Sequence, residues 1–138
     1  MTQRRGIQTK RVHWNKTRGK RWYKFWTADL SVIGKAVGVY IIARAVPDRP
    51  WDILYVGKGQ IRERLRLHRM RSDLVACRGE GMVVFTWTEV TREREALCVE
   101  GYLIITLKPR LCFRRYLGET PVNIPGCLKP EPDEAPIS

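Results

Sequence analysis

The sequence has no long hydrophobic run and few acidic side chains, and both shortages limit what the protein can be. No apolar stretch approaches the roughly 20 residues of a transmembrane helix, and the basic N-terminus lacks the apolar core of a signal peptide. Only 14 acidic residues stand against 26 lysines and arginines, which leaves a formal net charge of +12. This excess predicts a polyanionic partner, nucleic acid above all. The lack of an apolar span predicts no membrane partner.

The four cysteines include no C-x-x-C pair and lie far apart, at Cys77, Cys98, Cys112 and Cys127. This spacing argues against a structural zinc site, and we expect reduced thiols in a cytoplasmic protein. At 138 residues and 43% hydrophobic content, the chain suffices for one core. We therefore predict one domain over residues 36–118, between a basic extension (1–35) and a proline-rich acidic tail (119–138).

The first 35 residues hold most of the net charge, with ten basic residues against one acidic residue. Aromatic rings are interleaved with these charges, at Trp14, Trp22, Tyr23, Phe25 and Trp26. A basic segment with aromatic rings can follow phosphates and stack on bases. The residues that we expect to bind nucleic acid here are Lys16, Arg18, Lys20, Arg21 and Lys24. For the rings at 22–26 we favour the alternative that they pack onto the domain, because so many exposed rings would be a liability.

Two apolar runs rich in β-branched and aromatic residues, 37–42 and 53–56, predict a β-hairpin. Two prolines between the runs cannot continue a ladder. Antiparallel pairing about that loop sets Tyr40 opposite Tyr55 or the residue after it, so the two phenols become close neighbours. A single strand tyrosine usually only packs. A pair of them beside the glycine-rich residues 57–59 indicates a functional site.

Residues 60–77 read as one helix with an unusual polar stripe. Arg64, His68 and Arg71 fall on one side of it, between two apolar flanks. These flanks are Leu67, Met70 and Leu74 on one side and Ile61 and Leu65 on the other. The far face has the character of a solvated surface and comprises Arg62, Arg66 and Arg69. Cations beside apolar surroundings need an anionic partner, which could be a phosphate or a protein carboxylate.

A third strand is predicted over residues 83–90, and a helix follows it from a Thr91 cap to Pro109. Glu100 stands out in that helix because its neighbours one turn away are all apolar, namely Ala96, Leu97, Leu103 and Ile104. A carboxylate in such a stripe must be neutral or paired. A divalent cation would pair with it, and a salt bridge to Arg64 is the alternative.

Taken in order, these motifs resemble the GIY-YIG nuclease family. The matching elements are Gly38-Val39-Tyr40, Tyr55-Val56-Gly57-Lys58, residues 61–65, His68, residues 94–97, Glu100 and residues 108–111. The resemblance covers about residues 37–112 and extends to the nuclease domains of excision-repair, homing and restriction endonucleases. It implies an α+β fold with a small three-stranded antiparallel sheet flanked by helices.

The family resemblance also implies a role for each residue matched to a catalytic position: Tyr40, Tyr55, Lys58, Arg64, His68 and Glu100. The two tyrosines would flank the attacking water, with the lysine nearby to favour a phenolate. The arginine would hold the scissile phosphate, the histidine follows one helical turn later, and the glutamate would bind one Mg²⁺ or Mn²⁺. Phosphodiester hydrolysis needs a base, positive charge at the phosphate and a stabilised leaving oxygen, which these groups could supply.

The sequence departs from the family pattern at two places. Cys112 stands where the family usually has an asparagine, and the turn before the helix is one residue shorter than in the repair nucleases. Arg62 therefore competes with Arg64 for the phosphate-holding role, and we prefer Arg64 because it shares a helix stripe with His68. Arg62 and Arg71 are further candidates for contact with nucleic acid.

The sequence thus predicts a magnesium-dependent endonuclease that cuts double-stranded or branched DNA, with the N-terminal extension supplying sequence-independent affinity. The alternative is a basic DNA- or RNA-binding protein that keeps the fold without the chemistry. Three properties stay open at this point: whether cleavage is specific for a sequence or a structure, whether the substrate is DNA or RNA, and whether a homodimer forms.

Overall fold

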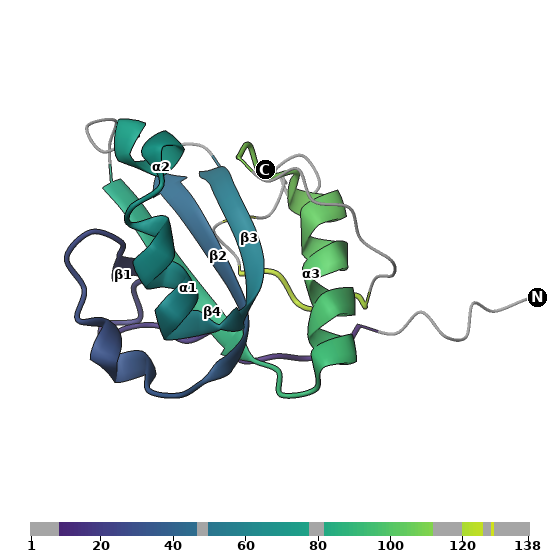
Figure 1. Cartoon of the computed structure of the whole chain (residues 1–138). Helices are drawn as coiled ribbons and strands as arrows, with labels where there is room; N and C mark the ends of the chain where they lie inside the picture. The colour runs from purple at the N-terminus through teal and green to yellow at the C-terminus, as the bar shows by residue number, and fades with distance from the viewer. Residues whose placement is uncertain (1–8, 47–49, 78–81, 112–119, 126–127, 129–138) are drawn as a thin grey trace, which may run out of the picture.

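A computed structural model describes residues 9–46, 50–77, 82–111, 120–125 and 128. Within these ranges the protein is an α+β fold built on a four-stranded antiparallel sheet with strand order β1-β4-β2-β3 (Figure 1). The strands are β1 (Tyr23–Lys24), β2 (Val37–Ala45), β3 (Asp52–Gln60) and β4 (Met82–Glu89). The helices are the 3₁₀ helix η1 (Leu30–Ile33) and the α-helices α1 (Ile61–His68), α2 (Ser72–Ala76) and α3 (Glu93–Leu107). Most of the predicted acidic tail, and Cys112 with it, lies outside the described residues.

The sheet is buried on both faces. Helices η1, α1 and α2 cover one face, which we call the α1 face, and α3 covers the other, the α3 face. Strands β2 and β3 lie between α1 and α3 in Figure 1. Strand β4 contributes side chains to both cores. Phe85 and Trp87 belong to the core of the α1 face, and Val84 belongs to the core of the α3 face. Six successive residues of β4 are therefore buried.

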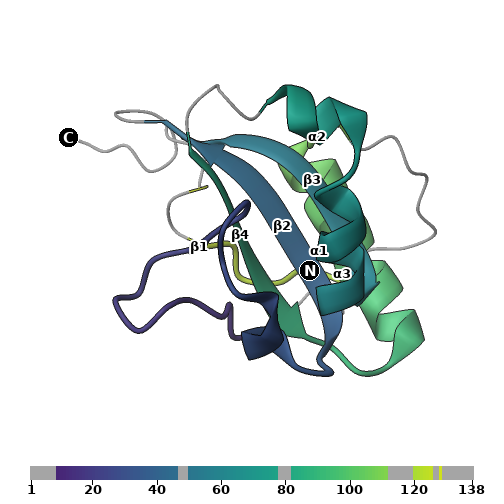
Figure 2. The ribbon, with the colours of Figure 1, turned by 60° about the vertical axis from the view of Figure 1, so that its left-hand side comes forward.

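The sheet has four strands where the sequence predicts three. The additional strand, β1, is two residues long and pairs Tyr23 with Phe85. Two residues show no hydrophobic period, so the pattern could not reveal this strand. The Tyr23 ring stacks on Phe85 at 5.4 Å, and Trp22 and Phe25 are 6% and 0% exposed. The interpretation that these rings pack the N-terminal segment onto the domain is therefore confirmed, and Figure 2 shows that segment along the β4 side of the sheet.

The predicted hairpin forms, but its register differs from the expected one. Tyr40 pairs with Gly57 rather than with Tyr55 or Val56, and Tyr55 pairs with Ile42. A β-bulge just after Ile42 inserts one residue into the ladder; without it, the register near the loop would set Tyr40 opposite Val56. This shifted register places the two tyrosines on one face as close neighbours, with ring centroids 6.3 Å apart and planes 13° apart.

The helix predicted over residues 60–77 is broken into α1 and α2. Arg71 has an extended backbone (φ −74°, ψ 133°) and forms the N-cap of α2. The break carries Leu74 into the core, whereas Leu67 and Met70, predicted to share its apolar flank, are 46% and 70% exposed. Packing of α2 on the sheet thus overrides the helical period of the local sequence.

Helix α3 matches the predicted element closely. Its N-cap is Arg92, one residue after the expected Thr91, and this cap makes no side-chain bond. Glu93 and Glu95 lie in the first turn, where the helix dipole favours them. The helix ends at a left-handed Lys108 (φ 51°), just before the proline. No helix in the described ranges combines the length and apolar character that a membrane span requires.

The described part of the N-terminal segment is bonded to a segment from the far end of the chain. The Lys10 amide donates to the Pro121 carbonyl at 2.9 Å, and the Val12 amide donates to Asn123 Oδ1 at 2.6 Å. The indole N–H of Trp14 donates to the Asn123 carbonyl at 2.8 Å. These bonds hold both segments in place on the α3 face, where Trp14 joins the core.

Candidate active site

Tyr40 and His68 share a buried hydrogen bond on the α1 face. Strand β2 places the Tyr40 hydroxyl 2.7 Å from Nε2 of His68, the last residue of α1. Tyr40 is 1% exposed and His68 7% exposed. A phenol and an imidazole at this distance can exchange a proton, which is the elementary step of general acid–base catalysis.

Tyr55 completes an aromatic cluster around this pair. Its ring centroid is 4.3 Å from that of His68. The guanidinium of Arg71 lies 4.9 Å from the centroid of the Tyr55 ring, within the range of a cation–π contact. The pKa of Arg71 is raised: burial lowers it, but hydrogen bonding and charge from Asp73, together with the Tyr55 phenol, outweigh the burial. A permanent positive charge therefore lies against Tyr55.

Two glycines of β3 leave room for the side chains of the site. A Cβ on Gly57 would lie 2.3 Å from the hydroxyl oxygen of Tyr40, and a Cβ on Gly59 would lie 3.3 Å from Nε of Arg64. Gly59 also has a φ of +125°, which favours glycine. Strand positions two residues apart lie about 7 Å apart on the same face. The Tyr40 hydroxyl and the Arg64 side chain therefore lie over successive same-face positions of this strand.

The structure thus gathers five of the predicted site residues on the α1 face, namely Tyr40, Tyr55, Arg64, His68 and Arg71. Arg64 is exposed, and its Nε donates to the Lys58 carbonyl at 3.3 Å. Arg62 lies apart from this group, in the wall of a cavity of about 250 Å³ that Lys35 and Glu63 also line. This arrangement favours Arg64 over Arg62 as the residue beside the tyrosines.

Lys58 lies on the opposite face of the sheet from the tyrosines. It pairs with Val39, whose side chain belongs to the core of the α3 face. Its ammonium group forms an ion pair with Glu93 in the first turn of α3. The expected contact between Lys58 and the phenols is therefore not formed, because successive strand residues point to opposite faces. Arg71 is the cation that contacts Tyr55 instead.

Glu100 lies on α3, the helix that covers the other face of the sheet. It is 0% exposed, so the predicted burial is confirmed, and Val99 and Leu103 beside it belong to the core of the α3 face. A carboxylate suits Mg²⁺, but this ion keeps several water ligands, and a fully buried side chain leaves no access for them. In the described ranges no group of three or more His, Cys, Asp or Glu could hold a metal ion. Glu100 as placed here does not fit a hydrated cation, and the metal stays a prediction.

Arg69, predicted to lie on a solvated face, is instead a structural link. Its guanidinium donates to the carbonyls of Phe25 and Ala28, both at 2.8 Å. Burial lowers the pKa of this arginine. Arg66 on the same predicted stripe is exposed and pairs with Glu63 at 3.7 Å. The helical pattern could not separate these two arginines, because the partners of Arg69 are backbone groups more than 40 residues away.

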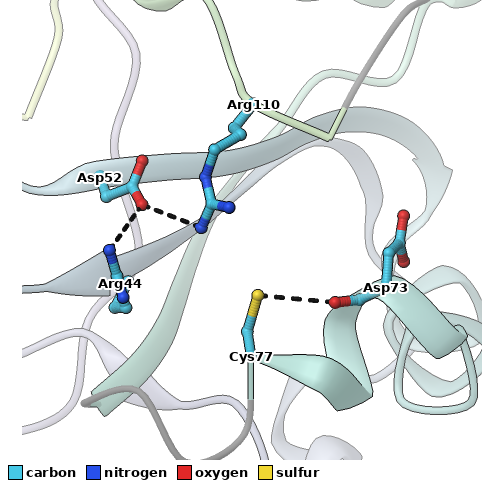
Figure 3. Close-up of polar contacts among 5 residues, drawn as sticks. All are labelled: Arg44, Asp52, Asp73, Cys77 and Arg110. Carbon is cyan, nitrogen blue, oxygen red and sulfur yellow. Dashed lines mark hydrogen bonds and ion pairs between the residues drawn. The ribbon is translucent and has the colours of Figure 1, made fainter.

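Sequence reasoning missed Asp52, which joins the hairpin to the segment after α3. Its Oδ2 accepts hydrogen bonds from Arg44 and Arg110, each at 3.1 Å (Figure 3). The Arg110 amide donates to the Ile53 carbonyl at 2.9 Å. Burial lowers the pKa of Arg110, but the charge and the hydrogen bond of Asp52, together with the nearby Cys77, outweigh it, so the pKa is raised. The matched motif at 108–111 therefore has a structural role, namely to hold the chain against edge strand β3.

The predicted nucleic-acid-binding residues of the N-terminal segment are all exposed: Lys16, Arg18, Lys20, Arg21 and Lys24. A hydrogen-bonded turn presents Lys16, Arg18, Lys20 and Arg21, and Lys24 follows in β1. The Thr17 carbonyl accepts from the amide of residue 20, and the Thr17 amide donates to the carbonyl of residue 21, each at 2.8 Å. This basic turn belongs to the folded structure, on the α3 face, rather than to a separate arm.

Comparisons of the chain with protein-family models, with curated proteins and with solved structures found no match. The resemblance to GIY-YIG nucleases therefore depends on the motifs quoted above, and what it implies about activity is a proposal.

Proposed function

We propose that the protein hydrolyses phosphodiester bonds of DNA at the α1 face. The observation that carries this proposal is the buried hydrogen bond between Tyr40 and His68, 2.7 Å long, beside an exposed arginine. In the tautomer with its ring proton on Nδ1, the imidazole accepts the phenol proton at Nε2. The phenolate then takes a proton from the attacking water, and the hydroxide adds to phosphorus. The bond between phosphorus and the leaving oxygen breaks, and that oxygen takes up a proton from solvent water.

Two arginines supply the positive charge that this reaction needs. Arg64 is exposed over Gly59, where its guanidinium can donate two parallel hydrogen bonds to phosphate oxygens. Arg71 lies against the Tyr55 ring and adds a second positive charge to the α1 face. The net charge of +12 attracts a polyanion to the whole surface.

The proposal keeps the divalent cation, Mg²⁺ or Mn²⁺, that the family resemblance implies. Such an ion, when bound, would stabilise charge on the phosphate and on the leaving oxygen. Because Glu100 is fully buried, the proton transfers and the phosphate contacts described above involve only side chains of the α1 face. The requirement for the ion is therefore tested separately from the requirement for these side chains.

A second candidate is a basic DNA- or RNA-binding protein without catalytic activity. The observation that favours it is the burial of the proposed chemical groups, since Tyr40 is 1% exposed and Tyr55 9% exposed. A protein of this kind would bind nucleic acid equally well with and without divalent ions, and would leave its backbone intact.

Nicking of supercoiled plasmid distinguishes the two candidates, and labelled branched DNA is the second substrate. Each is incubated with protein in Mg²⁺, in Mn²⁺ or in chelator. The variants are Arg64→Gln and its matched control Arg66→Gln, which removes an equally exposed charge of α1 two residues away. We expect the wild type and Arg66→Gln to nick the DNA and Arg64→Gln to nick about 100-fold more slowly. Binding without nicking under every condition would support the second candidate.

A further inference from the structure

A second basic cavity, of about 620 Å³, lies on the α3 face, away from the tyrosine cluster. The side chains that matter for its chemistry are four cations and two indoles: Lys16, Lys20, Arg21, Lys24, Trp22 and Trp51. Trp22 belongs to the core of the α3 face and Trp51 packs against it. The tyrosines belong to the other core, so this cavity is a separate site.

The cavity is strongly positive. In the described part of the chain, none of its four cations takes part in an ion pair. The basic turn holds three of them in position, and Lys20 has a left-handed backbone (φ 62°) within it. Four ordered cations in one wall repel one another unless an anion is bound between them. The cavity is therefore suited to an anionic ligand.

The cavity also has an aromatic wall. The rings of Trp22 and Trp51 meet edge to face, with centroids 5.3 Å apart and an interplanar angle of 72°. Trp51 is half-buried, so part of its ring remains accessible. Trp22 is only 6% exposed and belongs to the core, so it supports the ring of Trp51 from behind.

We propose that this cavity binds an unpaired nucleotide of single-stranded nucleic acid. The base stacks on Trp51, and phosphate oxygens lie among the cations. An acidic peptide would satisfy the cations but not the indole ring. A neighbouring cavity of about 500 Å³ is also lined by Lys16 and Lys20, together with Arg11 and His13. This neighbouring cavity provides room for the next nucleotide of the strand.

This binding requires neither cleavage nor a metal ion, so it is tested on the full chain in chelator. Fluorescence anisotropy follows a labelled thymidine hexanucleotide and a hexamer of the same phosphates without bases. We expect the hexanucleotide to bind about tenfold more tightly than the abasic hexamer. Trp51→Leu should abolish this difference, whereas Trp26→Leu, which changes a half-buried tryptophan on the α1 face, should retain it.

The charged part of the site has its own matched pair. Lys20→Gln should weaken binding of both oligomers about threefold. Lys108→Gln should leave the binding of both oligomers unchanged, although Lys108 is also an exposed lysine with a left-handed backbone. Equal binding of the two oligomers by the wild type would overturn the proposal, and so would equal effects of Trp51→Leu and Trp26→Leu. Displacement of the hexanucleotide by equimolar hexaglutamate would assign the cavity to acidic peptides instead.

A measurement on the unaltered protein covers the case in which Trp51→Leu fails to fold. An oligonucleotide with 5-iodouracil is photocrosslinked to the wild type, and the linked residue is identified by mass spectrometry. A crosslink at Trp51 or Trp22 supports the proposal, and crosslinks confined to residues outside this cavity overturn it. Because no step depends on cleavage, failure here leaves the nuclease proposal standing, and failure of the plasmid assay leaves this one standing.

Discussion

The ring of Tyr40 occupies the space that a side chain at Gly57 would fill. The two residues pair across β2 and β3, and a Cβ at position 57 would lie 2.3 Å from the hydroxyl oxygen of Tyr40. The glycine therefore allows the phenol to lie flat over its partner strand and to reach His68. The hairpin glycine and the candidate base are parts of one packing arrangement.

Gly57→Ala should therefore destabilise the protein by about 3 kcal/mol, because the added methyl group overpacks a core that has no space for it. Urea unfolding followed by circular dichroism measures the free energy. Gly19→Ala is the control, since the nearest atom to its new Cβ would lie 4.0 Å away, and we expect a change within about 0.5 kcal/mol. Equal effects of the two substitutions would contradict the packing of Tyr40 described above.

Tyr40→Phe keeps the ring and removes the hydroxyl that bonds to His68. We expect a loss of about 1–2 kcal/mol of stability, because a buried hydrogen bond is lost, and a fall of about 100-fold in plasmid nicking. Tyr55→Phe is the comparison, since its ring lies against the same imidazole, with ring centroids 4.3 Å apart. If both variants nick DNA at the wild-type rate, the tyrosines are not the base.

Arg69→Lys should destabilise the protein by about 1–3 kcal/mol, although the charge is conserved. A lysine cannot place two N–H groups on the carbonyls of Phe25 and Ala28 in the geometry of the guanidinium. Arg66→Lys is the matched control on the same helix and should change the stability by less than about 0.5 kcal/mol. Limited proteolysis adds a local readout, because loss of this link should expose the N-terminal segment first. Equal stability of both variants would contradict the structural role of Arg69 described above.

Magnesium should leave the melting temperature of the DNA-free protein unchanged, within about 1 °C, because Glu100 is 0% exposed and presents no carboxylate oxygen to a hydrated ion. Differential scanning calorimetry with magnesium and with chelator tests this, and Glu100→Gln is the parallel sample. A rise in the melting temperature that occurs in the wild type and is absent in Glu100→Gln would show that the carboxylate binds the ion after all.

Several features depend on local sequence, and these could be predicted from it. The β-branched residues of β2 and β3 specify the hairpin. The bulge was not predicted, and it sets Tyr40 and Tyr55 on one face, because in the register without it Tyr55 would point to the other layer. The apolar neighbours of Glu100 one helical turn away predicted its burial, because the helical period alone decides which residues surround it.

Other features depend on contacts between residues far apart in the chain, and only the tertiary structure decided them. Strand β1 exists because β4 offers it an edge, and Arg69 is a link because the N-terminal carbonyls lie within its reach. Trp22 and Trp51 meet across 29 positions of sequence to form one cavity wall. A local sequence pattern does not predict such contacts, since their free energy comes from burial against partners that the fold brings together.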